Sequence, residues 1–208
     1  MKKDIIVYED DNIIVCNKPV GMPSQSDRTF EQDLVSYVLT HRTEQNEPAY
    51  AAIINRLDKP VGGLVLFAKN KKAAAGLSAV SGEHGIEKNY YALVKGSPCD
   101  KGEFTDYLLK DGKNNISTVT DKDTKGSKKA VLLYEKLGEK TIDGEKYSLM
   151  RVRLLTGRHH QIRVQFSHHG YPLYGDIKYN SDFRNRRDVS PALFAYHLSF
   201  KNPVGADR

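Results

Sequence analysis

The sequence predicts an α+β fold: a single domain built on a mixed, largely antiparallel β-sheet with flanking helices. Short runs of β-branched and aromatic residues recur along the chain, separated by turn-forming residues. Segments with apolar residues at every fourth position, which are typical of amphipathic helices, lie between some of these runs. The regular βαβ alternation that a doubly wound sheet needs is absent, and at least two pairs of predicted strands are close enough in sequence to form hairpins.

The composition is that of a soluble globular protein. A chain of 208 residues, 39% hydrophobic and 28% charged, is long enough for one sizeable core, so we expect one domain over residues 1–208. No apolar run approaches the roughly 20 residues of a membrane span, and no apolar signal segment follows the start. Cys16 and Cys99 form no metal or disulfide pattern, which favours a cytoplasmic protein. The net charge of +6 favours a polyanionic partner such as nucleic acid.

The first third of the chain predicts a hairpin and then a helix. Residues 5–8 and 13–16 are β-branched runs that flank an acidic turn. After a loop rich in proline and glycine, Thr29 and Gln32 have the spacing of a capping box, so we expect a helix to begin near Thr29. Its apolar face has a period of four and consists of Phe30, Leu34 and Val38.

Two further strands, at 51–54 and 64–68, are predicted on either side of a polar turn that contains Asp58. Asn70 can cap a following helix over 71–78, and residues 87–95 form the next predicted strand.

The polar stretch 109–129 predicts an exposed β-ribbon or hairpin loop rather than a linker, and its lysines fit a solvated face as well as an RNA contact. Strands follow at 130–134 and 147–155, and one face of the second is basic. A helix that contains Ile162 and Phe166 ends at Gly170, and a late strand covers 193–200. In that strand, alternation places Phe194, Tyr196, Leu198 and Phe200 on one face.

Asp58 is the first candidate for chemistry, because a turn between two buried strands holds a side chain at a fixed place. An aspartate before Lys-Pro is more often a residue that only caps the turn. The turn by itself leaves both interpretations open.

Two adjacent histidine pairs, His159-His160 and His168-His169, suggest a metal site. Adjacent helical residues point about 100° apart, and partner ligands are missing nearby, so we expect no metal there. Arg158 and Arg163 are more informative, because an arginine beside a turn is a natural counter-ion for a carboxylate or a phosphate.

Several segments in order then resemble the RluA-type RNA pseudouridine synthases. The family's active-site motif, His-Arg-Leu-Asp followed by a Ser-Gly turn and an apolar strand, corresponds to residues 55–69. The Lys-x-Tyr-x-Ala-Leu-Val strand corresponds to residues 88–94. The remaining matches are Asn-Lys-Pro-x-Gly at 17–21, Gly-Arg-x-His-Gln-Ile-Arg at 157–163 and Pro-Leu-x-Gly-Asp at 172–176.

The resemblance implies the pseudouridine synthase catalytic fold and the isomerisation of uridine to pseudouridine in ribosomal or transfer RNA, with no cofactor and no catalytic metal. Asp58 would be the catalytic carboxylate, Arg163 its ionic partner, and Tyr90 would stack on the uracil. Because a paired uridine must be extruded, Arg56 would occupy the gap that the flipped base leaves.

The resemblance also places Asn55, Arg158 and Lys88 among the RNA-binding residues, and we expect a monomer that contacts neither membrane nor metal. Asn55 replaces the commonest family residue, histidine, and Gly62 replaces the usual serine. The asparagine leaves the Asp58 chemistry possible but puts the substrate class in question.

Two alternatives remain. One is an RNA-binding module that has kept this fold and lost its activity, against which the intact Asp58, Tyr90 and Arg163 count. The other is a glycosidase-like hydrolase, which would require Asp58 and a second carboxylate such as Asp176 within about 5 to 10 Å of each other.

Overall fold

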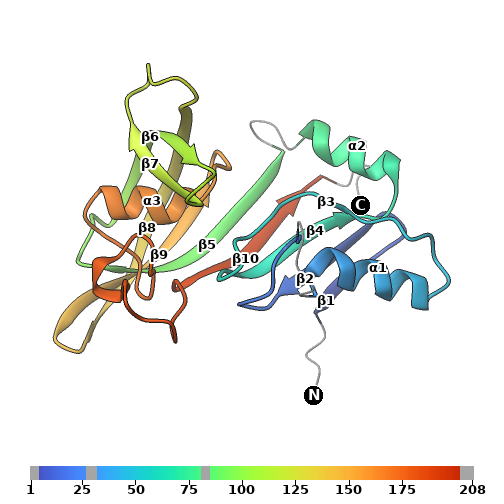
Figure 1. The fold of residues 1–208 in the computed structure, drawn as a ribbon, viewed down its shortest axis with the longest axis horizontal. Helices are drawn as coiled ribbons and strands as arrows, with labels where there is room; N and C mark the ends of the chain where they lie inside the picture. The colour runs from blue at the N-terminus through green and yellow to red at the C-terminus, as the bar shows by residue number, and fades with distance from the viewer. Residues whose placement is uncertain (1–4, 27–31, 81–84, 202–208) are drawn as a thin grey trace. The chain divides into compact units, whose positions relative to one another are not determined.

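The computed structural model describes residues 5–26, 32–80 and 85–201, and the chain divides into two compact units. Unit 1 takes in Met1–Ile86 and Leu198–Arg208, and unit 2 is Glu87–His197. The described residues contain ten strands, three α-helices and one 3-10 helix (Figure 1). Within each unit, the strand pairings described below are antiparallel, and helices separate several strands in sequence, so the predicted α+β class is confirmed. The expected single domain over residues 1–208 stays a prediction.

Unit 1 is organised around a three-stranded antiparallel ladder. Strand β1 (Ile6–Glu9) and strand β2 (Ile13–Lys18) form the predicted hairpin, with a register shift between Ile6 and Tyr8. Strand β2 also pairs with β4 (Gly62–Ala68), and the short β3 (Ala52–Ile53) pairs with the far end of β4. The predicted strands on either side of the Asp58 turn are therefore confirmed.

The core of unit 1 lies between this ladder and helix α2 (Lys71–Val80). Its buried members are Ile13, Leu66, Ala68, Ala73, Leu77 and Ile86. Each fully buried aliphatic side chain contributes about 2 kcal/mol to folding, so this cluster fixes the ladder against the helix. As the sequence predicted, Asn70 caps α2: its side-chain Oδ1 accepts a hydrogen bond of 2.8 Å from the backbone N–H of Ala73.

Helix α1 (Leu34–Glu44) begins later than the sequence predicted. Its N-cap is Asp33, whose Oδ1 accepts a 2.7 Å hydrogen bond from Ser36 N, while Gln32 lies before the helix. The expected start near Thr29 is therefore wrong; Thr29 itself and Phe30 lie outside the described residues. The predicted apolar face holds, because Leu34 and Val38 are fully buried.

Unit 2 is a twisted antiparallel sheet with the order β5-β9-β8-β6-β7 (Figure 1). The strands are β5 (Ile86–Lys95), whose first residue belongs to unit 1, β6 (Lys101–Asp111), β7 (Ile116–Thr120), β8 (Lys128–Ile142) and β9 (Glu145–Leu154). The polar stretch 109–129 forms the ends of β6 and β8 and all of β7, which confirms the predicted hairpin.

Helix α3 (Gln161–His168) packs beside the β6–β7 hairpin (Figure 1). Phe166 makes an edge contact with Phe104, with ring centroids 5.1 Å apart, and Val164 packs with Leu108 and Ala130. The helix stops before Gly170, which has a φ of 85°, as the sequence predicted. The short 3-10 helix η1 (Ser181–Phe183) follows.

Strand β10 (Leu193–Phe200) has residues in both units. Leu193 and Ala195 are buried, whereas Phe194 is 40% exposed. At the other end, Leu198 and Phe200 pack on the core of unit 1. The predicted alternation is present. Near the start of the strand, however, the buried face carries Leu193 and Ala195, and the aromatic Phe194 lies on the opposite face.

Candidate active site

In unit 1, Asp58 lies in the turn between β3 and β4, and Ser24 holds that turn in place. The buried Ser24 Oγ donates to the carbonyl of Leu57 at 2.7 Å and accepts from the Leu57 N–H at 3.0 Å. The carbonyl of Asp58 in turn accepts a hydrogen bond from Val61 N at 2.9 Å. Leu57 is 7% exposed and anchors the turn, while the Asp58 side chain is half-buried. The carboxylate is therefore presented on a fixed backbone.

Lys18 lies beneath the same turn. Strand alternation places it on the inward face of β2 with Ile14 and Cys16, and all three are fully buried. The ammonium donates to three carbonyl oxygens: Pro19 at 3.1 Å, Met22 at 2.7 Å and Lys59 at 3.2 Å. These bonds tie the loop that leaves β2 to the residue after Asp58.

The charge of Lys18 is linked to Asp58. Burial lowers the pKa of the Lys18 amine to about 8, and the negative charge of Asp58 opposes this shift. The three oxygens that bind the Lys18 ammonium are neutral, so they do not cancel its positive charge. The charge that acts on Lys18 is that of Asp58. The arrangement places a buried positive charge near the Asp58 turn.

Asn55 connects the turn to β4. Its Nδ2 donates to the carbonyl of Leu64 at 3.2 Å, and its Oδ1 accepts from the N–H of Leu66 at 2.8 Å. The amide thus pairs with the strand as a backbone peptide would. Both polar atoms of the Asn55 side chain are hydrogen-bonded within unit 1, so Asn55 positions the start of the turn against β4.

Arg56 differs from its neighbours in the turn. Its side chain is exposed, and it makes no hydrogen bond or ion pair with the described part of the chain. A cation in that state is available to an anionic ligand.

In unit 2, Tyr90 lies on the inner face of β5. Even-numbered residues of this strand point inward, and Tyr90 is 6% exposed. Tyr90 lies opposite Val152 of β9, which is itself fully buried. Lys88 is two residues earlier on the same face and is half-buried. The ring of Tyr90 is therefore held by the sheet.

Arg163 projects from α3 and pairs with Asp176. Its Nε donates to Asp176 Oδ2 at 2.7 Å and its Nη2 to Asp176 Oδ1 at 2.8 Å, and both residues are buried. The guanidinium also lies over the ring of Tyr179, 5.2 Å from its centroid. This bidentate geometry fixes the direction of the guanidinium.

Asp176 is a structural carboxylate. It is fully buried, and its Oδ1 also accepts from the backbone N–H groups of Lys178 at 3.0 Å and Tyr179 at 3.3 Å. A carboxylate so enclosed is closed to a sugar and to water. The hydrolase alternative, which needed Asp176 as a second catalytic acid, therefore loses its candidate.

Three of the four histidines of the α3 region make hydrogen bonds within unit 2. His159 contacts Ser117 and Asn115, His160 contacts the Tyr179 hydroxyl at 2.8 Å, and His169 contacts Asp106 at 3.1 Å. In the described ranges, no cluster of three histidine, cysteine or acidic residues could hold a metal ion. No helix in those ranges is long and apolar enough to cross a membrane.

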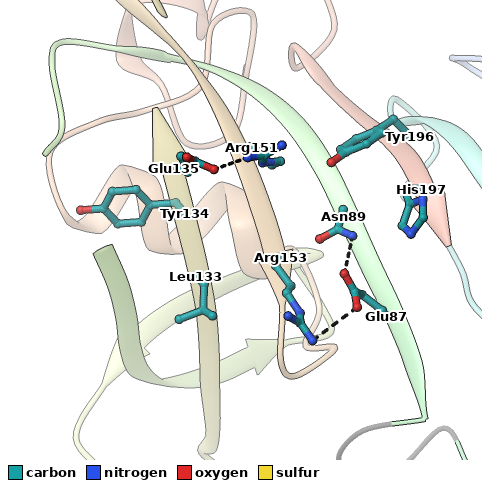
Figure 2. Close-up of a pocket in the computed structure, with 9 residues that line it drawn as sticks. All are labelled: Glu87, Asn89, Leu133, Tyr134, Glu135, Arg151, Arg153, Tyr196 and His197. Carbon is teal, nitrogen blue, oxygen red and sulfur yellow. Dashed lines mark hydrogen bonds and ion pairs between the residues drawn. The ribbon is translucent and has the colours of Figure 1, made fainter. Parts of the chain in front are cut away.

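A shallow pocket of about 390 Å³ lies on the other, outer face of the unit 2 sheet (Figure 2). Arg151 pairs with Glu135, and Arg153 pairs with Glu87 at 3.4 Å. Tyr196 and His197 of β10 complete the rim. None of the predicted site residues lines this pocket, and both of its arginines have carboxylate partners.

Sequence reasoning missed Lys18 and Ser24 as parts of the site, and it considered Asp176 only as the second carboxylate of a hydrolase, not as a partner of Arg163. Lys18 had a signal, because it continues the inward alternation of Ile14 and Cys16, where an apolar residue is expected. The contacts of Ser24 join residues 33 apart in sequence and had no local signal.

The chain is similar to known RNA pseudouridine synthases. Residues 12–168 match the family model described as RNA pseudouridylate synthase. The chain is 34% identical over 191 residues to tRNA pseudouridine synthase C of Haemophilus ducreyi, a match that covers 88% of this chain and 76% of that protein. It is 32% identical over 213 residues to ribosomal large subunit pseudouridine synthase D of Zymomonas mobilis, which covers 96% of this chain and 65% of that protein.

A solved structure shows the same fold. Human RNA pseudouridylate synthase domain containing 1 superposes with a TM-score of 0.80 and 22% sequence identity. The match covers 97% of this chain and 80% of the human chain.

Proposed function

Because the chain belongs to the RNA pseudouridylate synthase family, we propose that Asp58 is the carboxylate with which it converts uridine in RNA to pseudouridine. In this reaction the bond between ribose C1′ and uracil N1 breaks, the base rotates, and C1′ bonds to C5. C5 then loses a proton and N1 gains one, so the product is an isomer of the substrate.

The observation that carries the proposal is the support of the Asp58 turn. Ser24 fixes the backbone on one side, and the buried ammonium of Lys18 binds the other side through the carbonyl of Lys59. A carboxylate on a rigidly held backbone is what each possible role, as nucleophile or as base, requires.

Tyr90 and Arg163 are proposed to act in the same reaction from unit 2. The family match spans residues of both units, which supports a common task. Tyr90 is an inward aromatic ring that suits stacking on uracil, and Asp176 gives the Arg163 guanidinium a fixed direction. A double-mutant cycle between Asp58→Asn and Arg163→Lys tests the link. If the two side chains act as a unit, the double variant loses little more activity than the worse single variant.

Asp58→Asn is expected to reduce pseudouridine formation by at least about 10²-fold, because the amide keeps the shape and loses the charge. Mass spectrometry of nucleosides from treated RNA measures the product, and RNA affinity and the unfolding transition serve as controls. Full activity in this variant would overturn the assignment. An inactive wild-type chain that still binds RNA would favour the alternative, an RNA-binding module without chemistry.

Arg56 is proposed to fill the space of the extruded base, since its exposed cation has no partner in the described residues. Arg56→Ala should weaken RNA binding and slow turnover by about tenfold each, while stability stays unchanged. Fluorescence of 2-aminopurine placed next to the target uridine reports base extrusion. Unchanged fluorescence, affinity and rate would exclude this role.

The substrate is proposed to be ribosomal or transfer RNA, because the named relatives act on these two classes. Pseudouridine mapping of total RNA from cells with and without the gene identifies the modified uridine. We further propose a monomer in the cytoplasm; light scattering of the purified chain and fractionation of cells test these two points.

A further inference from the structure

Lys88 is a cation on the inner face of β5 that lacks a protein partner. Among the described residues it forms no hydrogen bond and no ion pair, and burial lowers the pKa of its amine without an opposing acidic group. It lies opposite Leu154 of β9, two residues from Tyr90 along the strand. An ammonium removed from water without a partner is unfavourable, so its partner is expected to come from outside the chain.

Other partly or fully buried lysines show how this chain treats a cation that serves its own fold. Lys69 binds Glu9 at 2.7 Å and Glu47 at 3.0 Å, and Lys136 binds Asp100 at 3.1 Å and Glu139 at 2.9 Å. Lys18, described above, is saturated by three carbonyls. Lys88 differs from these three lysines, because it binds neither a carboxylate nor a carbonyl among the described residues.

Gly157 gives an independent indication. Its φ is not in the left-handed region, so its backbone conformation does not require glycine. A Cβ added there would meet only the Lys88 ammonium, at an ordinary contact distance of 3.7 Å. Neither strain nor packing inside the protein explains the missing side chain. Its absence leaves space open beside the ammonium.

Arg158 adds a second cation next to this space. Its backbone N–H donates to Gln161 Oε1 at 3.0 Å, and its side-chain Nε donates to the carbonyl of Lys129 at 2.9 Å. The exposed guanidinium has no carboxylate partner among the described residues. The neutral carbonyl orients the guanidinium while its charge stays uncompensated.

We propose that Lys88, Gly157 and Arg158 form a binding site for one phosphate group of the RNA backbone, beside Tyr90. A phosphodiester is a small anion with oxygens in several directions, which suits an ammonium on one side and a guanidinium on the other. The open space at Gly157 admits its oxygens to the Lys88 ammonium. The site rests on the proposed function and deepens it, because it fixes the RNA strand at a set distance from the aromatic ring.

The test is the salt dependence of RNA binding, measured with the full chain and an RNA substrate identified by mapping. Lys88→Gln should weaken binding about tenfold at moderate salt and lower the slope of log affinity against log salt by about one. Arg153→Gln is the matched control: it removes the same charge from the outer face, where Arg153 already has Glu87. The control should keep the wild-type slope. Equal slopes for Lys88→Gln and the wild type would overturn the proposal.

Gly157→Ala tests the open space without removing a charge. The methyl group fits the fold, so the unfolding temperature should stay within about 2 °C of the wild type, while RNA affinity falls about fivefold. Unchanged affinity in a folded Gly157→Ala variant would show that no ligand atom enters this space and would contradict the site.

The source of the phosphate is decided by competition. If the site serves an RNA backbone, inorganic phosphate should displace RNA from the wild type better than chloride does at equal ionic strength, and this advantage should be lost in Lys88→Gln. Binding of inorganic phosphate that needs Lys88 but leaves RNA affinity unchanged would indicate a free-phosphate site and overturn the RNA assignment. A wild-type chain that binds RNA with the Lys88-dependent slope but forms no pseudouridine would contradict the proposed function and leave the phosphate site standing.

Discussion

The two ends of the β2–β4 ladder in unit 1 each bury a lysine, in opposite ways. At one end, beyond the Ile13–Ala68 pair, Lys69 is surrounded by carboxylates. At the other end, Lys18 lies opposite Gly63 and donates only to neutral carbonyls. The first end has no candidate catalytic residue, whereas the second carries Asp58.

The difference is visible in the pKa of each lysine. Burial acts to lower the pKa of Lys69, but hydrogen bonds to Glu9 and Glu47 raise it above its usual value. For Lys18 burial prevails and lowers the pKa to about 8. A buried lysine that is paired with carboxylates, such as Lys69, stabilises the fold. A buried lysine that is bound only by neutral carbonyls, such as Lys18, keeps a positive charge that can interact with a nearby carboxylate.

The Lys69 end extends into a network with α1. Arg42 is 4% exposed and donates to Glu47 at 3.0 Å, to the carbonyl of Lys69 at 2.6 Å and to the carbonyl of Tyr50. His41 pairs with Glu9 at 2.8 Å. These contacts join β1, α1 and the end of β4, so this end holds the elements together.

The largest effect on stability is expected from Lys69→Met. The change leaves Glu9 and Glu47 without their shared cation, and the free energy of unfolding should fall by about 3 kcal/mol, the lower end for a broken buried pair because both carboxylates are partly exposed. Denaturant titration measures the loss. The rate per folded molecule should stay at the wild-type value, and a large loss of rate would mean that the two ends do not divide their tasks.

Lys18→Met is expected to show the reverse pattern. The loss of three hydrogen bonds and the relief of a buried charge offset each other, so the free energy of unfolding at pH 7 should change by about 1 kcal/mol or less. The turnover rate should fall about tenfold, since the Asp58 turn loses an anchor and a positive charge. Single-turnover kinetics separates the rate from RNA affinity. A Lys18→Met variant with the wild-type rate would show that the Lys18 end of the ladder does not serve the reaction.

The third effect develops only at alkaline pH and concerns the response of stability to pH. The folded protein releases the Lys18 proton near pH 8, while the unfolded chain retains it up to about 10.5. In this window the unfolded state binds more protons, so the Lys18 contribution to stability rises with pH, by up to about 3 kcal/mol. Denaturant titration from pH 7 to 10 gives the free energy of unfolding of the wild type and of Lys18→Met, and the difference between the two measures the contribution of Lys18. A difference that is constant with pH would show that Lys18 has an ordinary pKa.

Local patterns in the sequence predicted the elements of the fold well. Alternation and turn residues located the strands around Asp58, and a single asparagine located the start of α2. The start of α1 was missed because a capping box was chosen over Asp33, and only the folded loop shows which residue accepts the hydrogen bond from Ser36. Local signals compete at helix starts, and tertiary context decides between them.

The site was predictable to the extent that its residues sit in recognisable segments. Asp58 was found through its turn, but the residues that hold the turn, Lys18 at the end of β2 and Ser24 in the following loop, lie more than 30 residues away in sequence. Arg163 was expected to pair with Asp58, which stays a prediction, and its contact with Asp176 required the folded loop after α3. Residue types can be read from the sequence, whereas pairings among several candidates need the coordinates.

Asn55 has a consequence for how the Asp58 turn responds to acid. An amide offers a donor to Leu64 and an acceptor to Leu66 at any pH, because it does not titrate. An imidazole in the same place, as in the commonest family pattern, combines a donor and an acceptor only while it is neutral, and it gains a proton near pH 6.5. With asparagine, the two hydrogen bonds that hold the turn against β4 therefore do not change between pH 5 and 8. With histidine, they would depend on pH in this range.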